Sequence, residues 1–256
     1  MALCDTQVKV NFFWHCTLLL ALWCLLTGAT WLQFQSLPAD GSPGMTVTGL
    51  LRVPEGEGPF PAAVLLPDCD GISPHERVWG LRLVAQGYVV YLIDSFFTRD
   101  VTTTCGDAAS VPVMDDLRGA IAKLATLPQV DPSRIAVVGW QDGADTALVW
   151  AQEDGPGLAV AFYPSCATTA PLRRSVLFVL PGDYAGEQAC NAYAFGQYEA
   201  GKVALQRIAP DGVGAGFDCQ ECAGAYLGGP GGWSDPADTL VSEALYGEMA
   251  RLLGSP

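Results

Sequence analysis

The chain has 256 residues, which is enough for one large α/β domain or two small ones. Half of the residues are hydrophobic and 16% are charged, so a sizeable core can form, and disorder, collagen and coiled coil are excluded as the main architecture. The 13 basic and 27 acidic residues give a formal net charge of −14, which would repel a phosphate backbone and excludes nucleic acid as a partner.

Residues 1–29 have the pattern of a leader. An apolar run covers residues 12–26, and the small residues 27–29 would supply a cleavage site, as in a secretory signal peptide. An uncleaved membrane anchor is the alternative, because extension of the run to Leu32 approaches the ~20 residues that a membrane span needs. In both cases we expect residues 30–256 to be exported (periplasmic or secreted) or anchored outside the cytoplasm, with the membrane touched only by the N-terminal segment.

Beyond residue 30, strand and helix patterns alternate. Ser73, Pro74 and Glu76 form the capping box of one predicted helix. The predicted elements, in chain order, are strands 31–37, 46–53 and 62–66, helix 74–86, strand 89–93, helix 115–127, strand 135–138, a helix ending near 153, strands in LAVAFY, VLFVL and VALQRI, and helix 237–253. This alternation predicts a single α/β domain with a mostly parallel, doubly wound sheet and helices on both faces.

The turn after strand 135–138 carries the clearest functional signal. Gly139 and Gly143 stand two residues before and two residues after Gln141, between a buried strand and a helix. This spacing is typical of a nucleophile elbow, in which a strained turn presents its central residue and has no room for side chains at the flanking positions. A glycine-rich turn of another α/β fold is the alternative interpretation.

Six cysteines follow the leader, an even number that favours disulfides in an oxidising compartment. Cys69 and Cys105 follow successive predicted strands, and so do Cys166 and Cys190, so we predict the pairs Cys69–Cys105 and Cys166–Cys190. The spacing of Cys219 and Cys222 fits a redox pair, a local disulfide, two separately paired thiols or half of a zinc site. Zinc is poorly supported because no second such pair and no nearby histidine exist. We therefore predict no metal.

Several long stretches resemble the dienelactone hydrolase family of α/β-hydrolases, and especially its exported members. They are PFPAAVLLPDCDGISPHERVWGLRLVAQGYVVYLIDSF, the pair Cys105-Gly106, LATLPQVDPSRIAVVGW, AVAFYPSC and DPADTL. Together they span nearly the whole chain from Trp31. The resemblance implies an α/β-hydrolase fold and hydrolysis of an ester or lactone by a Ser or Cys nucleophile, an acid and a His, without a cofactor.

The catalytic positions that the resemblance implies are substituted. The nucleophile position falls on Gln141, whose amide cannot form an acyl-enzyme. The His position falls on Ala215, and no histidine follows His75, which we interpret as a capping or solvent-exposed residue of the helix that begins at Pro74. The acid position falls on Asp183, which then has no imidazole to orient.

The oxyanion-hole positions also depart from the family pattern. They fall on Cys69, Asp70 and Asp142, where carboxylates would oppose a developing oxyanion. Five carboxylates could gather at one edge of the sheet and bind a cation, but we favour solvated acidic loops: Asp68, Asp70, Asp142, Asp145 and Asp183.

Three hypotheses follow for the function. The favoured one is a non-hydrolytic relative that binds a small polar ligand, or a protein partner that the sequence does not name, in a vestigial pocket. The second is an active ester or lactone hydrolase with Cys69 or Cys166 as nucleophile. The third is a thiol–disulfide protein built on Cys219 and Cys222. We further expect Gln141 to partly fill the acyl site, bonded to Asp183 or to loop amides.

Overall fold

The computed structural model describes most of the chain beyond the predicted leader. The described residues are 28–106, 110–182, 185–200, 205–208, 213, 215–219 and 235–254. Residues 31–256 form one compact unit. Residues 1–27 of the predicted signal peptide or anchor, as well as Asp183 and Cys222, lie outside the described residues.

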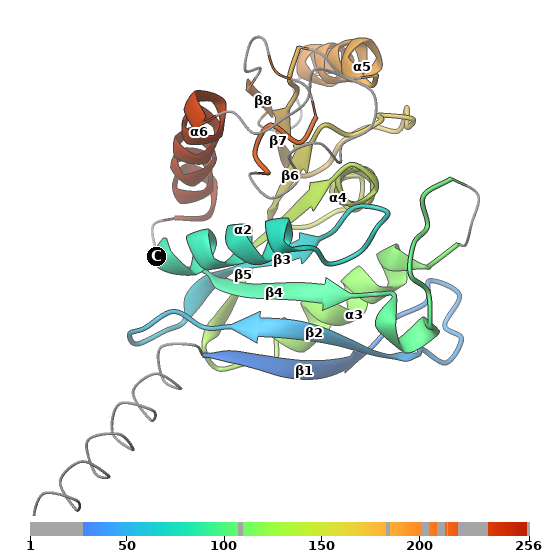
Figure 1. Cartoon of the computed structure of the whole chain (residues 1–256), viewed down its shortest axis with the longest axis vertical. Coiled ribbons are helices and arrows are strands. Elements are labelled where there is room, and N and C mark those ends of the chain that lie inside the picture. Colours follow the sequence, from blue (N-terminus) through green and yellow to red (C-terminus); the bar gives the residue numbers. More distant parts are fainter. Residues whose placement is uncertain are drawn as a thin grey trace, which may run out of the picture. The chain divides into compact units, whose positions relative to one another are not determined.

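One eight-stranded sheet runs through the domain, in the order β1-β2-β4-β3-β5-β6-β7-β8 (Figure 1). β2 is antiparallel to β4, whereas the pairs from β4 through β3, β5, β6 and β7 to β8 are parallel. The mostly parallel sheet is therefore confirmed. Its strands are β1 (Ala29–Gln35), β2 (Thr46–Arg52), β3 (Phe60–Leu66), β4 (Val89–Asp94), β5 (Val130–Trp140), β6 (Leu158–Phe162), β7 (Ser175–Val179) and β8 (Leu205–Ile208).

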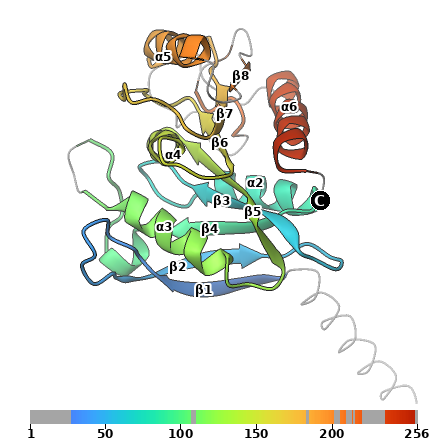
Figure 2. The ribbon, with the colours of Figure 1, turned by 180° about the vertical axis from the view of Figure 1, so that it is seen from behind.

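Helices cover both faces of this sheet, as Figures 1 and 2 show from opposite sides. On one face lie α2 (Pro74–Ala85) and α6 (Asp235–Leu253), and on the other lie α3 (Val113–Leu124), α4 (Asp142–Ala151) and α5 (Glu187–Ala200). Because successive strand residues point to opposite faces, Val64 of β3 packs with the second set of helices and Leu65 with the first. The continuous apolar runs of the sequence are strands buried on both sides.

The capping box of α2 is present. Ser73 Oγ accepts from the backbone N–H of His75 at 3.1 Å, and Glu76 Oε2 accepts from the backbone N–H of Ser73 at 2.8 Å. Further along the helix, Arg82 donates to both carboxylate oxygens of Asp238, at 2.7 and 2.8 Å, and so joins α2 to α6.

Three local features differ from the sequence prediction. Residues 187–200 form α5, whose alanines and mixed polarity give no clear amphipathic pattern in the sequence. A short 3-10 helix, η1 (Phe97–Arg99), follows β4. β5 begins at Val130 instead of Ile135, because an irregular start to its pairing with β3 places Val130 opposite Phe60.

The elbow glycines differ from a helix glycine in what a methyl group would meet. A Cβ at Gly143 would overlap the carbonyl oxygen of Leu66, whereas a Cβ at Gly247 in α6 would meet nothing within 4 Å. We expect Gly143→Ala to lower the free energy of unfolding by about 2 kcal/mol or more through overpacking against backbone. Gly247→Ala should raise it by up to about 1 kcal/mol through helix propensity. Urea denaturation of both variants tests the pair, and equal effects would contradict the assigned crowding.

Candidate functional site

The predicted elbow lies at the carboxyl end of β5. Gln141 has φ 47° and ψ −109°, a left-handed conformation that side chains rarely adopt, and α4 begins at the next residue. A Cβ at Gly139 would overlap the backbone of Gly143, so the segments before and after Gln141 are in backbone contact and leave no room for side chains at these two positions. Gly139 and Gly143 thus have the crowding, and Gln141 the strain, that a nucleophile elbow requires.

Gln141 presents an amide at the apex of this turn. Its backbone N–H donates to the carbonyl of Phe162 at 3.1 Å, which fixes the turn against the end of β6. Its side chain is half-buried and makes no hydrogen bond within the described part of the chain. The expected bond to Asp183 concerns a residue outside that part. The apex therefore offers an amide donor and acceptor but no group that attacks an acyl carbon.

A buried carboxylate lies directly behind the elbow. Asp218 Oδ2 accepts from Trp140 Nε1, Trp79 Nε1 and His75 Nε2, each at 3.0 Å, and its Oδ1 accepts from the hydroxyl of Tyr163 at 3.0 Å. The partners come from α2, from the last residue of β5 and from the residue after β6. One carboxylate thus joins a helix, two strands and the turn that contains Asp218. Sequence reasoning missed this role of Asp218 because its donors lie far from it in the chain, up to 143 residues away for His75.

The interpretation of His75 as a solvent-exposed or capping residue is wrong. Its side chain is 1% exposed, and its Nδ1 lies 3.7 Å from Glu76 Oε1. Burial by itself lowers the pKa of His75, but the hydrogen bond to Asp218 and the contact with Glu76 outweigh burial and raise the pKa to about 10. Burial raises the pKa of Asp218, whereas the His75 hydrogen bond and charge lower it further than burial raises it. The pair is a buried imidazolium–carboxylate ion pair.

The position expected for the catalytic histidine lies in the same turn as Asp218. Ala215 is half-buried and packs against the cluster that contains Trp140 and Tyr163. The bond from Trp140 to Asp218 therefore brings the turn of Ala215 toward the residue that precedes Gln141. A methyl group at position 215 has no proton to give or take, so Ala215 cannot act as a base.

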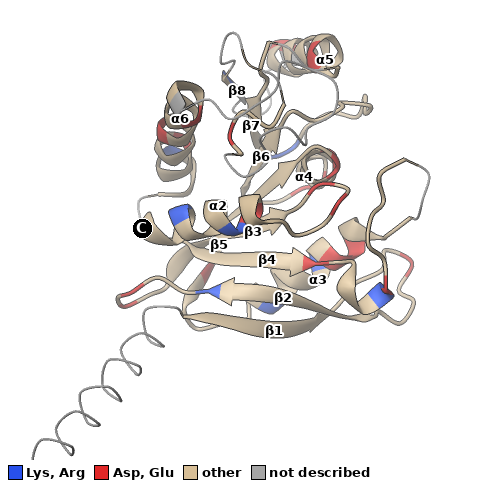
Figure 3. Ribbon diagram, in the orientation of Figure 1, with Lys and Arg blue, Asp and Glu red and all other residues tan. Residues whose placement is uncertain are grey.

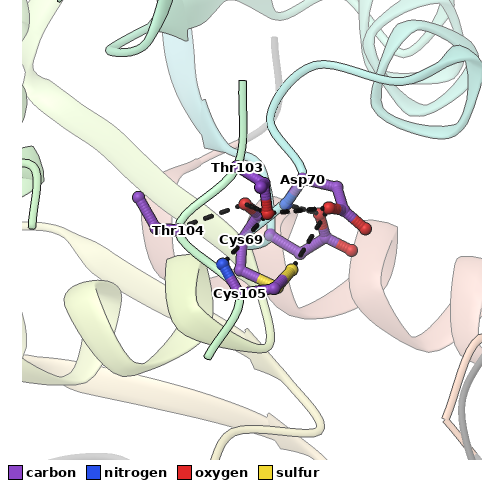
Figure 4. The surroundings of a disulfide bond; sticks show 6 residues. Cys69, Asp70, Thr103, Thr104 and Cys105 are labelled. Atoms are coloured by element: carbon purple, nitrogen blue, oxygen red, sulfur yellow. Dashed lines mark hydrogen bonds between the residues drawn. A yellow bond between two sulfur atoms is a disulfide. The ribbon is translucent and has the colours of Figure 1, made fainter. Parts of the chain in front are cut away.

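A disulfide joins the loops at the positions expected for the oxyanion hole. Cys69, after β3, is bonded to Cys105, after η1, with 4.9 Å between the Cα atoms (Figure 4). The carbonyl of Cys69 accepts from the backbone N–H of Thr104 at 2.8 Å. Asp70 Oδ1 accepts from the Thr103 hydroxyl at 3.0 Å and lies 3.2 Å from Cys105 Sγ. We name residues 69–70 with 103–105 the clamp.

The carboxylates near the elbow have different structural roles. Asp145 accepts from the backbone N–H groups of Ser165 and Cys166, at 3.0 and 3.1 Å, and so orders the loop after β6. Asp68 Oδ1 accepts from the backbone N–H of Asp70 at 2.9 Å. Asp142 is exposed at the surface, yet partial burial and the nearby Asp145 raise its pKa. Acidic residues are spread over many loops and helices of the domain (Figure 3), which fits solvated acidic loops better than a cation site.

The second predicted cysteine pair is also a disulfide. Cys166, after β6, is bonded to Cys190 in α5, with 5.1 Å between the Cα atoms. Cys219 is disulfide-bonded and fully buried, and it directly follows the turn that contains Asp218. Cys69 and Cys166 therefore offer no thiolate while these bonds are intact, and the sulfur of Cys219 is closed to a thiol partner.

Among the described residues, no helix is long and apolar enough to cross a membrane.

Removing the Asp218 charge should destabilise the fold strongly. We expect Asp218→Asn to lower the free energy of unfolding by about 3–5 kcal/mol, because the His75 imidazolium would be left buried without its counter-charge. Tyr163→Phe removes one neutral donor to the same carboxylate and should cost about 1 kcal/mol. Urea denaturation at neutral pH compares the two variants. An Asp218→Asn loss no larger than that of Tyr163→Phe would contradict the ion pair.

The ion pair also predicts how stability depends on pH. Because the folded pKa of His75 is raised to about 10 from its ordinary 6.5, its stabilisation is complete below about pH 6.5 and is lost as the pH rises through 10. The difference in unfolding free energy between the parent chain and His75→Gln should therefore shrink steadily from pH 6.5 to pH 10. Denaturation curves across this range measure it, and a constant difference would mean that His75 is neutral in the fold.

Comparison with known proteins identifies the family. Residues 47–177, 131 of the 256 residues, match the dienelactone hydrolase family. No curated protein matches the chain. A dienelactone hydrolase-like promiscuous phosphotriesterase from metagenomic libraries is 20% identical, with a TM-score of 0.70, and the match covers 89% of this chain and 100% of that one.

Two further solved structures have the same fold. A candidate dienelactone hydrolase from Klebsiella pneumoniae subsp. pneumoniae MGH 78578 is 16% identical with a TM-score of 0.67, covering 87% of this chain and 99% of its own. A thermostable esterase from Pseudomonas putida ECU1011 is 13% identical with a TM-score of 0.64, covering 88% and 83%. The family match, the eight-stranded sheet and the elbow geometry agree: the chain belongs to the dienelactone hydrolase family.

Proposed function

We propose that this member of the dienelactone hydrolase family does not hydrolyse esters or lactones and instead binds a small polar ligand, or a protein partner, at the elbow. The observation that carries the proposal is Gln141 at the strained apex between β5 and α4. The fold keeps the costly backbone that presents a nucleophile, but the side chain presented is an amide. An amide can hold a polar group without attacking it.

The chain also lacks a histidine that could serve as the base. It contains two histidines, His15 in the predicted leader and His75. His75 is fully buried in the ion pair with Asp218, so its imidazole is charged and cannot accept a proton from a nucleophile. Ala215 stands at the position where the family resemblance places the catalytic histidine.

The alternative hydrolase with a cysteine nucleophile has less support. Cys69 and Cys166 are both bonded to other cysteines, and a disulfide sulfur does not act as an acyl acceptor. Such an enzyme would become active only after its disulfide had been reduced to free the thiol. The thiol–disulfide alternative rests on Cys219 and Cys222, of which Cys219 is fully buried and Cys222 lies outside the described residues.

The ligand that fits this proposal is small and polar. Gln141 supplies two amide donors and one acceptor, and Asp142 stands beside it at the start of α4 with a raised pKa. Carboxylates at this end of the sheet disfavour an anionic ligand. The disulfides and the leader pattern fit an exported location, so the proposed ligand or partner is met outside the cytoplasm.

Substitution of Gln141 tests the missing chemistry. The purified chain should show no turnover of short esters and lactones, and Gln141→Ser should remain inactive because no imidazole can take the hydroxyl proton. The double variant Gln141→Ser with Ala215→His should gain measurable activity. Release of the alcohol or acid product is followed against the uncatalysed rate.

Matched controls make the outcome clear. Gln141→Ala with Ala215→His carries the new histidine without a nucleophile and should stay inactive. Turnover by the parent chain that disappears after a single Cys→Ala substitution would overturn the proposal. Robust activity of Gln141→Ser alone would reveal another base and would overturn it too.

A further inference from the structure

The clamp brings two sulfur atoms and a carboxylate to one point of the surface. Cys69 Sγ, Cys105 Sγ and a carboxylate oxygen of Asp70 all lie within 4.8 Å of one another. Figure 4 shows the Asp70 carboxylate joined by dashed lines to Cys105 and to Thr103, which lies beside it. Two thiolates and a carboxylate form a donor set that suits Zn²⁺, but sulfur in a disulfide is not such a donor.

Much of the clamp is held by bonds that do not depend on the disulfide. The Thr104 N–H donates to the carbonyl of Cys69 at 2.8 Å, and the Thr103 hydroxyl lies 3.0 Å from Asp70 Oδ1. The Cys105 N–H donates to the Thr103 hydroxyl oxygen at 3.0 Å. These hydrogen bonds would keep the two cysteines and Asp70 together after the sulfur–sulfur bond is broken.

This disulfide is also the most accessible one described. Cys69 and Cys105 are half-buried and Asp70 is exposed, whereas Cys166 is 6% exposed and both Cys190 and Cys219 are fully buried. A reductant in solution can reach only a sulfur that is open to attack. Mild reduction should therefore open Cys69–Cys105 before the buried bonds.

We propose that reduction of the Cys69–Cys105 disulfide turns the clamp into a Zn²⁺ site with two cysteine thiolates and the Asp70 carboxylate as ligands. A soluble dithiol supplies the two electrons: it becomes a cyclic disulfide, and its two protons pass to the cysteine sulfurs. Zn²⁺ then displaces both thiol protons and binds the two thiolates and the carboxylate, with water as the fourth ligand. The oxidised clamp binds no Zn²⁺.

The change in geometry is small. Zn–S bonds of about 2.3 Å in a tetrahedral site separate the two sulfur atoms by about 3.8 Å. The Cα atoms are 4.9 Å apart, so rotation of the two side chains provides most of the extra separation. The net charge of −14 favours capture of a cation.

The experiment uses the full chain, with Cys4, Cys16 and Cys24 replaced by Ser so that the leader offers no thiols. The chain is treated with a dithiol until mass spectrometry of alkylated protein counts two free thiols, and the reductant is removed without air. Co²⁺ is then titrated as a spectroscopic probe, and Zn²⁺ is added in competition. We expect one Co²⁺ per reduced chain, a thiolate-to-cobalt absorption band, and loss of that band on addition of Zn²⁺.

Variants identify the ligands. Cys105→Ser should abolish the absorption band, and Asp70→Asn should weaken Co²⁺ binding by at least about tenfold. Asp100→Asn, which removes an exposed carboxylate after η1, and the double variant Cys166→Ser with Cys190→Ser should leave binding unchanged. Circular dichroism verifies that each variant is folded.

Four results would overturn the proposal. They are equal Co²⁺ binding by the oxidised chain, no stoichiometric binding by the reduced chain, an unchanged affinity in Asp70→Asn, and reduction of a buried disulfide before Cys69–Cys105. None of these readouts depends on whether the protein hydrolyses esters, so the Zn²⁺ site and the proposed function fail or stand separately.

Discussion

The buried carboxylate of Asp218 is the constraint on which the elbow region depends. A carboxylate removed from water must be paired and fully hydrogen-bonded, and Asp218 meets both conditions with one imidazolium, two indole N–H groups and one phenol. The donors come from three places in the fold, with His75 and Trp79 both in α2, so satisfying one charge fixes α2, the ends of two strands and the turn of Ala215 together. Because Trp140 is bonded to Asp218, the position of Gln141, the next residue in the chain, is restrained as well.

At the elbow, the backbone has the strained geometry of a nucleophile turn, and the side chain that it presents is an amide. Gly139 and Gly143 are required by close contacts between backbone segments, and those contacts are the same for any residue at the apex. The side chain at position 141 takes no part in these backbone contacts, so they do not determine its identity. Backbone packing therefore preserves a strained turn whose apex residue, Gln141, carries an amide instead of a hydroxyl or a thiol.

Two disulfides hold loops near the elbow in place. The clamp joins the loop after β3 to the segment after η1, and Cys166–Cys190 joins the loop after β6 to α5. Asp145 adds backbone hydrogen bonds at the second of these loops. The loops at this end of the sheet are thus held by covalent bonds and by backbone hydrogen bonds to a carboxylate.

The sequence by itself determined the α/β alternation, the mostly parallel sheet, the capping box of α2, the elbow and two disulfide pairs. Each follows from short-range patterns: strand periodicity, N-cap chemistry, glycine spacing and the shared sheet edge of successive parallel strands. Helix α5 and the early start of β5 depend on packing and strand register, which carry no local signal. The role of His75 was decided only by the tertiary structure, because its charge depends on Asp218, 143 residues away, and on burial that no local sequence pattern specifies.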